Sequence, residues 1–378
     1  MAFLDHFDLT DVVELTSRSW ARNQLGKSIA PFSIDKLLGF DKIPKVVIVG
    51  FCNNSKDEKI LLAIRERLYN LYWHHSNCEI SDLGNVLNAN DTEVPSLIAQ
   101  LTELPCTVIL LSSQIEVAHQ IYLSYIQLQN TLNLLVCDSI VRLGFYNESI
   151  SNTNYIGHIV SHEPNYLFNA SFLGYQTYLN DPDELRTIEK FNFDLIRLGL
   201  LKSDIHITEP LARNTDFAIL SVNSVRKSDA PSNHLSTPNG LLAEEFCQIA
   251  RYCGISNKLS TCLISGFNPN GIDNQTIDLI AQSIWFVADG IHNRIDDGNI
   301  ADENVYLTYK VTTNIENTDI VFYKNKINGR WWMKVPLLDE TKNRFRRHQI
   351  IPCLFSDYQQ ATSGEIPENW WRAFQKLM

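Results

Sequence analysis

Polar side chains directly follow five short apolar runs in this chain, and these are the residues whose types and spacing could do chemistry. The five polar segments are residues 51–54, 112–114, 138–142, 221–225 and 266–269, and Asp138 is their single carboxylate. Amides both donate and accept hydrogen bonds, so Gln114 and Asn223, with the hydroxyl of Ser221, can satisfy each other or ordered water without a cation. We therefore expect these three side chains to form a neutral hydrogen-bonding lining rather than a set of metal ligands.

One pair of histidines has the spacing of metal ligands on a helix. His158 and His162 are four residues apart, with Glu163 adjacent, so a helix would place both imidazoles on one face. However, residues 155–160 are at least as typical of a strand as of a helix, and Pro164 follows closely. Ordinary surface or capping histidines are therefore favoured over a metal site.

The other reactive side chains lack partners at a motif spacing. His74 and His75 are consecutive and would point in different directions on a helix, so we interpret them as incidental. Cys137 precedes Asp138, where a neighbouring cation could lower its pKa, but no histidine is identifiable as its base, which favours a packed thiol. No G-x-S-x-G elbow nominates a serine, although a Ser-His-Asp arrangement elsewhere stays open. Neither a dinucleotide fingerprint after the first run nor a P-loop motif is present.

The apolar runs that precede the polar segments predict buried parallel strands at residues 46–49, 107–111, 132–136, 217–220 and 261–264. Between them, apolar residues recur at the three-to-four spacing of helices over residues 60–73, 115–128, 241–252 and 277–291. This alternation predicts an α/β fold with helices on both faces of a sheet. Ligands of such sheets bind beyond the carboxyl ends of the strands, where the polar segments would lie.

Four segments share their order and spacing with the motifs of a known family. They are LSSQ at 111–114, DSIVR at 138–142, SVNSV at 221–225 and STPNGL at 236–241. In turn they resemble the GGxH, DAHxD, SxDxD and STPGGL-like motifs of the arginase, agmatinase and formimidoylglutamase family of manganese-dependent ureohydrolases, and most closely its formimidoylglutamase-like branch. Residues 81–85 and 266–269 also resemble the family's DLGN and EVNP stretches. The resemblance covers roughly residues 40 to 295 and implies a three-layer α/β/α arginase-like (ureohydrolase) fold with a mainly parallel central sheet.

The resemblance also shows what the chain has lost. Family members use two manganese ions that bridge and deprotonate a water for attack on an amidine or guanidine carbon. The six ligand positions read here Gln114, Asp138, Ile140, Arg142, Asn223 and Val225, and the family's substrate-holding Glu in EVNP falls at Gly266. One carboxylate of four is kept, both imidazoles are lost, and Arg142 adds a positive charge. We therefore expect no manganese cofactor, and we expect Arg142 to fill the vacated volume and pair with Asp138.

Two hypotheses of function follow from this resemblance. In the first, the chain is a formimidoylglutamase- or arginase-like protein that has lost the dimanganese site and amidine hydrolysis, and acts as a binding or regulatory pseudoenzyme. The degenerate positions would then line a pocket for a small molecule in the strand-end crevice. In the alternative, it is an active hydrolase of a C–N bond in an amidine or guanidine substrate, or catalyses a metal-independent reaction in the same crevice. Family members commonly form trimers, hexamers or dimers, so the resemblance implies a homo-oligomer.

Composition excludes several broad classes of partner. The chain has 378 residues and a formal net charge of −11, which argues against a sequence-independent grip on nucleic acid. We interpret the one dense basic run, residues 344–348, as a solvated face, with an anion or partner contact as the alternative. No window approaches the roughly 18 consecutive apolar residues of a membrane span. The N-terminus carries Asp5, Asp8 and Asp11 instead of the basic start of a secretory signal, so we expect a cytoplasmic protein.

Cysteine usage agrees with a reducing compartment. The chain has eight cysteines and no CxxC pair, which favours buried thiols over disulfides or a zinc site. The eight are Cys52, Cys78, Cys106, Cys137, Cys247, Cys253, Cys262 and Cys353.

The pattern divides the chain into three parts: an N-terminal segment at 1–40, a ureohydrolase-like α/β domain at 41–300 and a C-terminal extension at 301–378. The extension has alternating segments at 305–309 and 320–323 and two tryptophan pairs, 331–332 and 370–371. We expect the aromatics to pack the extension on the domain or on a neighbouring subunit, with a partner-binding surface as the alternative. A turn at 363–367 should lead into a terminal helix, Glu368–Leu377.

Overall fold

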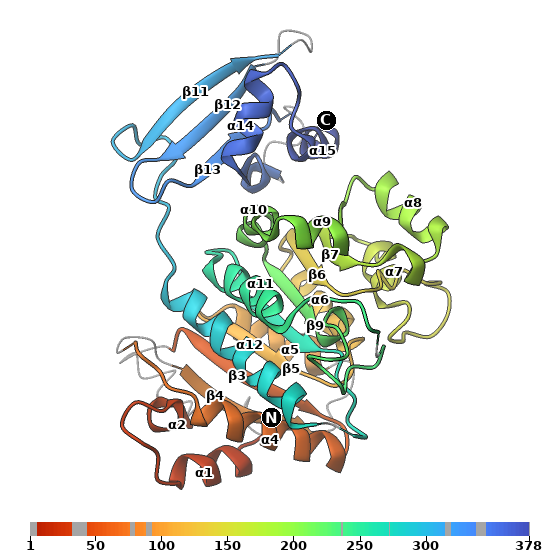
Figure 1. Cartoon of the computed structure of the whole chain (residues 1–378), viewed down its shortest axis with the longest axis vertical. Coiled ribbons are helices and arrows are strands. Elements are labelled where there is room, and N and C mark those ends of the chain that lie inside the picture. The colour runs from red at the N-terminus through yellow and green to blue at the C-terminus, as the bar shows by residue number, and fades with distance from the viewer. Residues whose placement is uncertain are drawn as a thin grey trace.

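A mainly parallel sheet forms the centre of the computed structural model, which describes residues 6–31, 44–75, 80–87, 93–235, 237–271, 273–313, 319–337 and 345–377 (Figure 1). Its strands lie in the order β1-β4-β3-β5-β10-β9-β6-β7-β8, and β2 also pairs with β4. Their bounds are β1 (Phe7–Asp8), β2 (Ala30–Pro31), β3 (Val46–Cys52), β4 (Ile80–Leu87), β5 (Thr107–Leu111), β6 (Leu132–Cys137), β7 (Leu167–Tyr175), β8 (Asp194–Arg197), β9 (Phe217–Ser221) and β10 (Thr261–Ser265). Among these described strands, β1 alone runs antiparallel to its neighbour.

Helices cover both faces of the sheet and complete three layers. One face packs against α1 (Thr10–Ser17), α2 (Leu25–Ser28), α4 (Ser55–Asn70), α9 (Leu198–Ser203), α10 (Thr208–Arg213), α11 (Ala243–Ile255) and α12 (Asn274–His292). The other face packs against α5 (Glu93–Thr102), α6 (Val117–Gln127), α7 (Tyr155–Ser161) and α8 (Pro182–Lys190). Every residue of β5, β6, β9 and β10 is buried, as expected for strands between two helical layers. The predicted three-layer α/β/α architecture is confirmed.

The five predicted strands are β3, β5, β6, β9 and β10, and the four predicted helices are α4, α6, α11 and α12. Helix α4 begins earlier than predicted because the side chain of Asn54 caps it, accepting hydrogen bonds from two backbone N–H groups. Strand β4 was not predicted, because its sequence contains several polar residues. Its Asp82 is fully buried and pairs with the equally buried Arg65, with Nε and Oδ2 2.9 Å apart.

Residues 155–160, interpreted above as at least as typical of a strand, lie in helix α7. Tyr155, Ile156 and Ile159 are fully buried there, and they share one helical face that packs into the second layer. The three buried positions follow the helical period of 3.6 residues rather than the alternation of a strand.

The C-terminal unit, defined here as the described residues from 306 to 377, has its own antiparallel sheet in the order β11-β12-β13-β14. Its elements are β11 (Tyr306–Thr312), β12 (Asp319–Asn325), β13 (Trp331–Lys334), β14 (Ile350–Cys353), α14 (Phe355–Thr362) and α15 (Glu368–Leu377). The helix predicted at the C-terminus is therefore confirmed as α15. Trp331, Trp332 and Trp370 are buried, whereas Trp371 is 38% exposed.

The C-terminal unit packs against the amino-terminal edge of the main sheet. Arg372 in α15 pairs with Asp194 at the start of β8, with 2.9 Å between Nη1 and Oδ1. The guanidinium of Arg213 lies 4.4 Å from the ring centroid of Trp332, a cation–π contact across the same boundary. The polar segments that follow the strands lie at the opposite, carboxyl-terminal edge. The unit therefore packs on the domain at the edge away from those segments (Figure 1).

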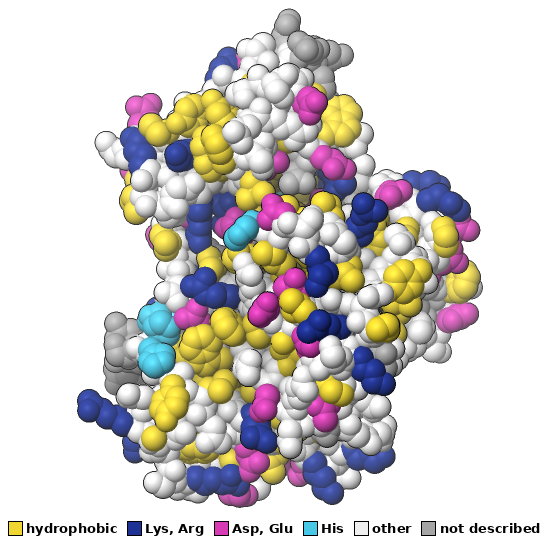
Figure 2. Space-filling view, in the orientation of Figure 1, with side chains coloured by type: hydrophobic (Ala, Val, Ile, Leu, Met, Phe, Trp, Pro, Cys, Tyr) yellow, Lys and Arg dark blue, Asp and Glu magenta, His cyan; other side chains and the backbone are white. Residues whose placement is uncertain are grey.

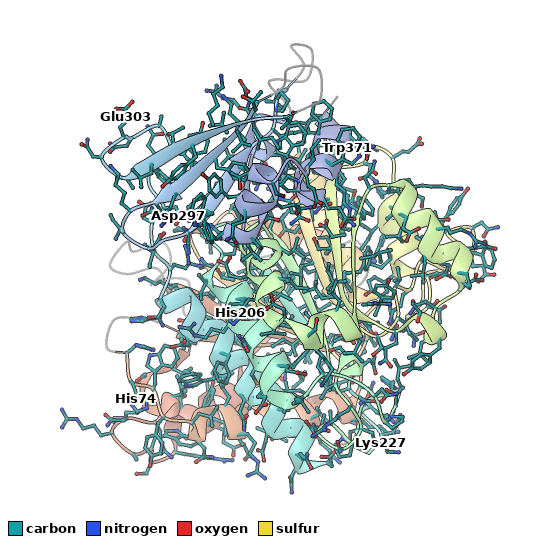
Figure 3. All side chains as sticks on the ribbon, turned by 45° about the horizontal axis from the view of Figure 1, so that its top comes forward. His74, His206, Lys227, Asp297, Glu303 and Trp371 are labelled. Carbon is teal, nitrogen blue, oxygen red and sulfur yellow. The ribbon has the colours of Figure 1, made fainter. Side chains whose placement is uncertain are left out.

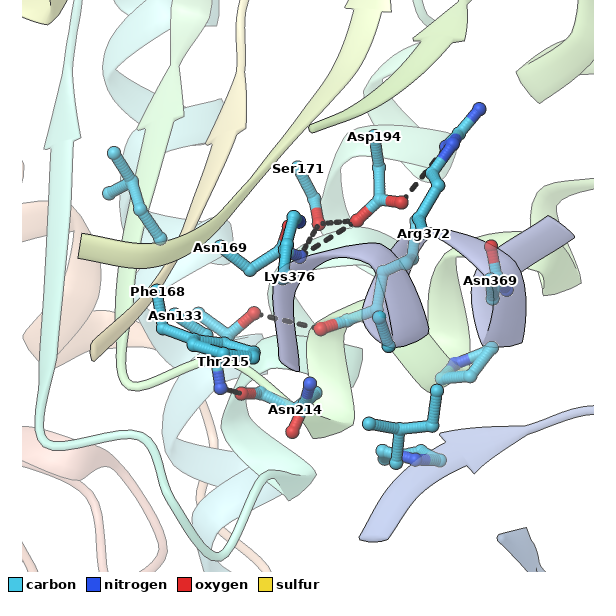
Figure 4. Close-up of a pocket in the computed structure, with 16 residues that line it drawn as sticks. Asn133, Phe168, Asn169, Ser171, Asp194, Asn214, Thr215, Asn369, Arg372 and Lys376 are labelled. Carbon is cyan, nitrogen blue, oxygen red and sulfur yellow. Dashed lines mark hydrogen bonds and ion pairs between the residues drawn. The ribbon is translucent and has the colours of Figure 1, made fainter. Parts of the chain in front are cut away.

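A small polar cavity of about 40 Å³ lies at this boundary (Figure 4). Asn133 and Asn169 line it from the main sheet, and Arg372 and Lys376 line it from α15. Lys376 donates a hydrogen bond to the side chain of Asn169, and burial lowers the pKa of its ammonium group to about 8. The cavity has room for little more than a water molecule, so we interpret it as part of the packing boundary.

The basic run at 344–348 is only in part the solvated face that the sequence predicts: Arg346 and Arg347 are exposed, but the run also contacts the main domain. Arg344 lies outside the described residues, but Arg347 forms an ion pair with the buried Asp216 and donates to the carbonyl of Thr131. The His348 ring is fully buried and stacks on Phe168, with centroids 3.8 Å apart. The run anchors the C-terminal unit because its charge is complementary to the buried carboxylate at the start of β9.

Acidification should weaken this anchor through His348. Burial, with the positive charges of Arg347, Lys258 and Lys376, lowers the pKa of His348 from its ordinary value near 6.5 to about 2. Below pH 6.5 the imidazole of His348 is therefore protonated in the unfolded chain but stays neutral in the folded chain. As the pH falls further, the free energy of unfolding decreases by about 1.4 kcal/mol per pH unit. We expect His348→Gln to reduce this slope between pH 6 and about pH 4, measured by urea denaturation. Equal slopes for both proteins would contradict the assignment.

The seven cysteines within the described residues are buried and free, in agreement with the prediction of packed thiols. Burial raises the pKa of the Cys137 thiol to about 12, which opposes a thiolate nucleophile at this strand end. Asp5, Cys78 and Ser236 lie outside the described residues. Within the described ranges, every helix is too short or too polar to span a lipid bilayer.

Candidate functional site

The predicted pairing of Arg142 with Asp138 is confirmed. Asp138 directly follows β6, and its Oδ2 accepts a hydrogen bond from Nε of Arg142 at 2.9 Å. The two residues are 2% and 7% exposed, so this is a buried ion pair. Burial, the largest single effect, would lower the pKa of the Arg142 guanidinium, but the charge and hydrogen bond of Asp138, together with Tyr155 and Glu116, outweigh it and the pKa is raised. Arg142 stays charged, and it neutralises the carboxylate of Asp138.

The backbone and the loop after it hold Arg142 in place. Its φ angle is +60°, in the left-handed region that side-chain-bearing residues rarely adopt. Nη1 donates to the carbonyl of Asn152 at 2.7 Å. Because a strained backbone persists only where its surroundings fix it, the ion pair and this second bond together determine where the guanidinium lies.

Three further groups interact electrostatically with Arg142: Tyr155, Glu116 and His234. The hydroxyl of Tyr155 is buried and makes no hydrogen bond within the described part of the chain. The charge of Glu116 acts on Arg142. Burial and the positive charge of Arg142 lower the pKa of His234, so this imidazole is a neutral base near neutral pH. A carboxylate, an imidazole and a phenol thus accompany the buried ion pair.

The residues from 221 to 225, compared above with an SxDxD motif, serve as hydrogen-bonding and packing groups. Asn223 lies in the short 3-10 helix after β9, and its Oδ1 accepts the backbone N–H of His234 at 2.9 Å and of Leu235 at 3.3 Å. The hydroxyl of Ser221 accepts the N–H of Asn223 at 3.3 Å. Val225 is fully buried. The amide oxygen of Asn223 is therefore used by the backbone of the following loop.

Gly266, compared above with a substrate-holding glutamate, has no room for a side chain. Its φ angle is +86°, and a Cβ there would lie 2.5 Å from Oγ of Ser221 and 2.9 Å from Nδ2 of Asn223. The neighbouring Ser265 hydroxyl is buried and unpartnered among the described residues. The side chains of Asn223 and Ser221 thus occupy the space that a side chain at position 266 would need.

Substitution of Gly266 should therefore destabilise the fold. We expect Gly266→Ala to lower the free energy of unfolding by about 1–3 kcal/mol, because alanine is strained at positive φ and clashes with two side chains. Gly271→Ala is the matched control, since a Cβ there meets nothing within 4 Å and the backbone is not left-handed. Denaturation of both variants checks this, and equal stability of the two would contradict it.

Gln114 belongs to a separate group at the ends of β3 and β5. Its Oε1 accepts a hydrogen bond from Nδ2 of Asn53 at 2.8 Å. Beside it, Asp57 is buried and accepts from the hydroxyl of Ser113 at 2.7 Å. The three side chains of the expected neutral lining are hydrogen-bonded without a cation, but not to each other: Ser221 accepts the backbone N–H of Asn223, the amide oxygen of Asn223 accepts backbone N–H groups of the following loop, and Gln114 bonds Asn53.

A cavity of about 120 Å³ lies beside this group, between β3, β5 and α6. Its polar lining comprises Asn53, Ser112, Gln114, Glu116 and Gln120. The side-chain oxygen of Gln120 is buried and unpartnered within the described ranges. A cavity of this size with amides, a hydroxyl and one carboxylate can hold a small polar molecule through hydrogen bonds.

The donor set does not fit a dimanganese centre. Two such cations need several carboxylates to offset their repulsion, with imidazoles completing the shells. Here Arg142 holds Asp138, Ile140 and Val225 have no donor atom, and backbone N–H groups occupy the oxygen of Asn223. In the part of the chain that the structure describes, no three His, Cys, Asp or Glu residues are grouped to hold a metal ion.

The alternative histidines do not form a metal centre within the described ranges either. His158 lies in α7 and His162 follows it, and both rings contact His119 in α6, with centroids 5.7 and 6.4 Å away. Burial and the two neighbouring histidines lower the pKa of His119 to about 4. His75, interpreted above as incidental, instead bonds Asp289 at 2.8 Å and stacks on a second histidine ring in α12.

Sequence reasoning missed three residues of the site: Asp57, Glu116 and His234. Asp57 lies in the first turn of α4 and Glu116 directly precedes α6, outside the segments that follow the strands. His234 lies in the loop between β9 and α11. An acidic residue in the first turn of a helix that follows a strand is a sequence signal that could have nominated Asp57.

Comparison with known proteins identifies the fold. No family model and no curated protein matches the chain. The crystal structure of Trypanosoma cruzi formiminoglutamase with Mn²⁺ has a TM-score of 0.60 and 13% identity, covering 67% of this chain and 95% of that one. The crystal structure of formimidoylglutamase from Bacillus subtilis has a TM-score of 0.63 and 14% identity, and the match covers 74% of this chain and 96% of that one. Arginase from Medicago truncatula has a TM-score of 0.52 and 16% identity, and the match covers 65% of this chain and 86% of that one. The chain therefore has the arginase-like α/β/α fold.

Proposed function

We propose that this protein descends from the ureohydrolase family and has lost the dimanganese site and amidine hydrolysis, so that it acts as a binding or regulatory protein. The observation that carries the proposal is the buried ion pair between Arg142 and Asp138. A guanidinium bonded to the last carboxylate of the ligand set opposes a second positive charge at the same place. The cytoplasmic location and the homo-oligomeric state stay predictions.

The strand-end crevice is the proposed place of a retained ligand. Its 120 Å³ cavity carries amide and hydroxyl groups, and the side-chain oxygen of Gln120, which lines it, is buried without a partner among the described residues; Ser265, at the end of β10, has a second such oxygen outside the cavity lining. Buried polar atoms are usually paired, so these oxygens favour a bound polar molecule or ordered water. Glu116 lines the cavity, and His234, which does not line it, interacts electrostatically with Glu116 and Arg142; these two groups would supply the carboxylate and the imidazole of a metal-independent reaction in this crevice.

Manganese should leave the stability of the protein unchanged. Only a ligand that binds the folded state preferentially raises the melting temperature, and the altered donor set gives manganese no such site. We expect millimolar MnCl₂ to shift Tm by less than about 1 °C, and elemental analysis after dialysis to find manganese far below one ion per chain. An active formimidoylglutamase treated in parallel is the positive control.

The same preparation should be assayed for turnover of formimidoylglutamate, agmatine and arginine. The proposal expects no urea or formamide release above a heat-denatured sample. Stoichiometric manganese together with turnover would overturn it and establish the hydrolase alternative. Turnover without manganese that His234→Ala abolishes would instead establish a metal-independent enzyme.

A further inference from the structure

A groove of about 440 Å³ opens at the carboxyl ends of β7 and β8, and no residue that lines it belongs to the crevice described above. Its walls come from three segments: residues 175–178 at the end of β7, residues 197–202 at the end of β8 and in α9, and Arg226 with residues 238–240 in the loop after β9. Ligands of parallel sheets bind at this edge, and the C-terminal unit packs at the opposite one.

The groove is basic although the chain is acidic. Arg197, Lys202 and Arg226 line it, one from each of β8, α9 and the loop after β9, and no carboxylate is among its described lining residues. Elsewhere acidic and basic side chains are interspersed, as Figure 2 shows for one face. In a protein with a net charge of −11, three cations that converge on one concavity focus a positive potential there.

Part of this charge is free to act on a ligand. Arg197 is exposed and has no ion pair or hydrogen bond among the described residues. Arg226 pairs with Asp229 through Nε at 2.8 Å, and its terminal amino groups make no bond in the described part of the chain. Lys202 forms an ion pair with Glu245, with 3.3 Å between Nζ and Oε2. Both carboxylates also accept backbone N–H groups at the start of α11, which divides their charge between two donors.

The ring of Tyr178 lines the groove, and hydrogen bonds of its hydroxyl group fix its orientation. Tyr178 is 66% exposed, yet its hydroxyl donates to the side chain of Gln176 and accepts from Nδ2 of Asn239 at 3.3 Å. An exposed ring that is hydrogen-bonded at its tip offers a rigid face at low entropic cost. Gln176 itself is buried and donates to the hydroxyl of Ser139, next to Asp138.

We propose that this groove binds a small organic anion. Its carboxylate or phosphate contacts Arg197 and the terminal amino groups of Arg226, and its planar part contacts the ring of Tyr178. Planar guanidinium groups match the oxygens of either anion through paired hydrogen bonds. The inference goes beyond the proposed loss of hydrolysis, because the groove shares no lining residue with the strand-end cavity and would bind its ligand with or without catalysis.

Calorimetry on the full chain at low salt tests the proposal, with AMP, citrate, inorganic phosphate and adenosine as probes. We expect AMP to bind at least about tenfold more tightly than phosphate, citrate to bind, and adenosine not to bind. Phosphate binding with AMP no tighter would overturn the role of Tyr178. Failure of all three anions to bind at about 10 mM would overturn the proposal.

Variants separate this site from general surface charge. Arg197→Ser should weaken AMP binding by about tenfold or more, and Gly199→Glu should abolish it, because Gly199 lines the groove and a Cβ there meets nothing within 4 Å. Lys227→Ser is the matched control, since this exposed residue follows Arg226 but does not line the groove (Figure 3).

Gln114→Ala, in the strand-end cavity, should likewise leave the affinity for AMP unchanged. Equal losses in Arg197→Ser and Lys227→Ser would show diffuse electrostatics and overturn the assignment. Manganese content and turnover are measured on the same samples, so failure of anion binding is distinguishable from failure of the proposed function.

Discussion

Replacement of Arg142 by methionine is expected to lower the free energy of unfolding by about 3–5 kcal/mol. The substitution keeps most of the side-chain volume and the backbone conformation but removes the charge. Asp138, which is 2% exposed, would then keep its negative charge in a buried place with only the N–H of Ile140, 3.3 Å away, as a weak partner. Breaking a buried ion pair on one side leaves an uncompensated charge, which costs far more than the pair itself contributes.

Two further variants determine whether the pair is responsible. The double variant Arg142→Met with Asp138→Leu should recover most of the loss, because it removes both charges together. Arg186→Met is the control, since Arg186 pairs with Asp183 on the exposed side of α8 and should cost less than about 1 kcal/mol. Urea denaturation of all variants measures these differences. A loss below about 1 kcal/mol in Arg142→Met would show that water screens the pair and would contradict its burial.

Truncation before Arg330 should give insoluble or strongly destabilised protein. The deletion removes β13, β14, α14 and α15, so β12 keeps β11 but loses its other neighbour, β13. Ile320 and Phe322, which are fully buried, would then face solvent on an unpaired strand edge. Asp216 in the main domain would also lose its ion pair with Arg347. Solubility, Tm and the size-exclusion mass of the truncated chain check this prediction.

A pair of tryptophan variants distinguishes packing from docking. Trp370 is fully buried and donates its indole N–H to the carbonyl of Lys334 at 2.8 Å, so Trp370→Ala should cost about 3–5 kcal/mol. Trp371 is 38% exposed, as its place at the surface in Figure 3 illustrates, and Trp371→Ala should cost less than about 1 kcal/mol. A soluble, fully stable truncation with an unchanged oligomeric state would contradict a structural role for the C-terminal unit.

Local patterns in the sequence were enough to predict much of the architecture. Continuous apolar runs indicate strands buried on both faces, and β5, with all five residues buried, is such a strand. Strand β4 was not predicted because its buried Asp82 is tolerable only with Arg65, which lies on α4 and is brought there by the fold. A buried charge depends on a partner distant in sequence, so no local pattern reveals it.

The same distinction holds for the candidate site. The residue types at the positions compared above with metal ligands were sufficient to predict that Arg142 would pair with Asp138. The two residues are only four positions apart at the end of one strand, so they cannot lie far from each other. Tertiary structure alone decided that Glu116 and His234 interact electrostatically with Arg142, since they come from other loops. It also decided that Arg197 shares a groove with Lys202 and the loop after β9. Side chains converge from separate strands only after the sheet has set their order and register, and that order is a property of the whole fold.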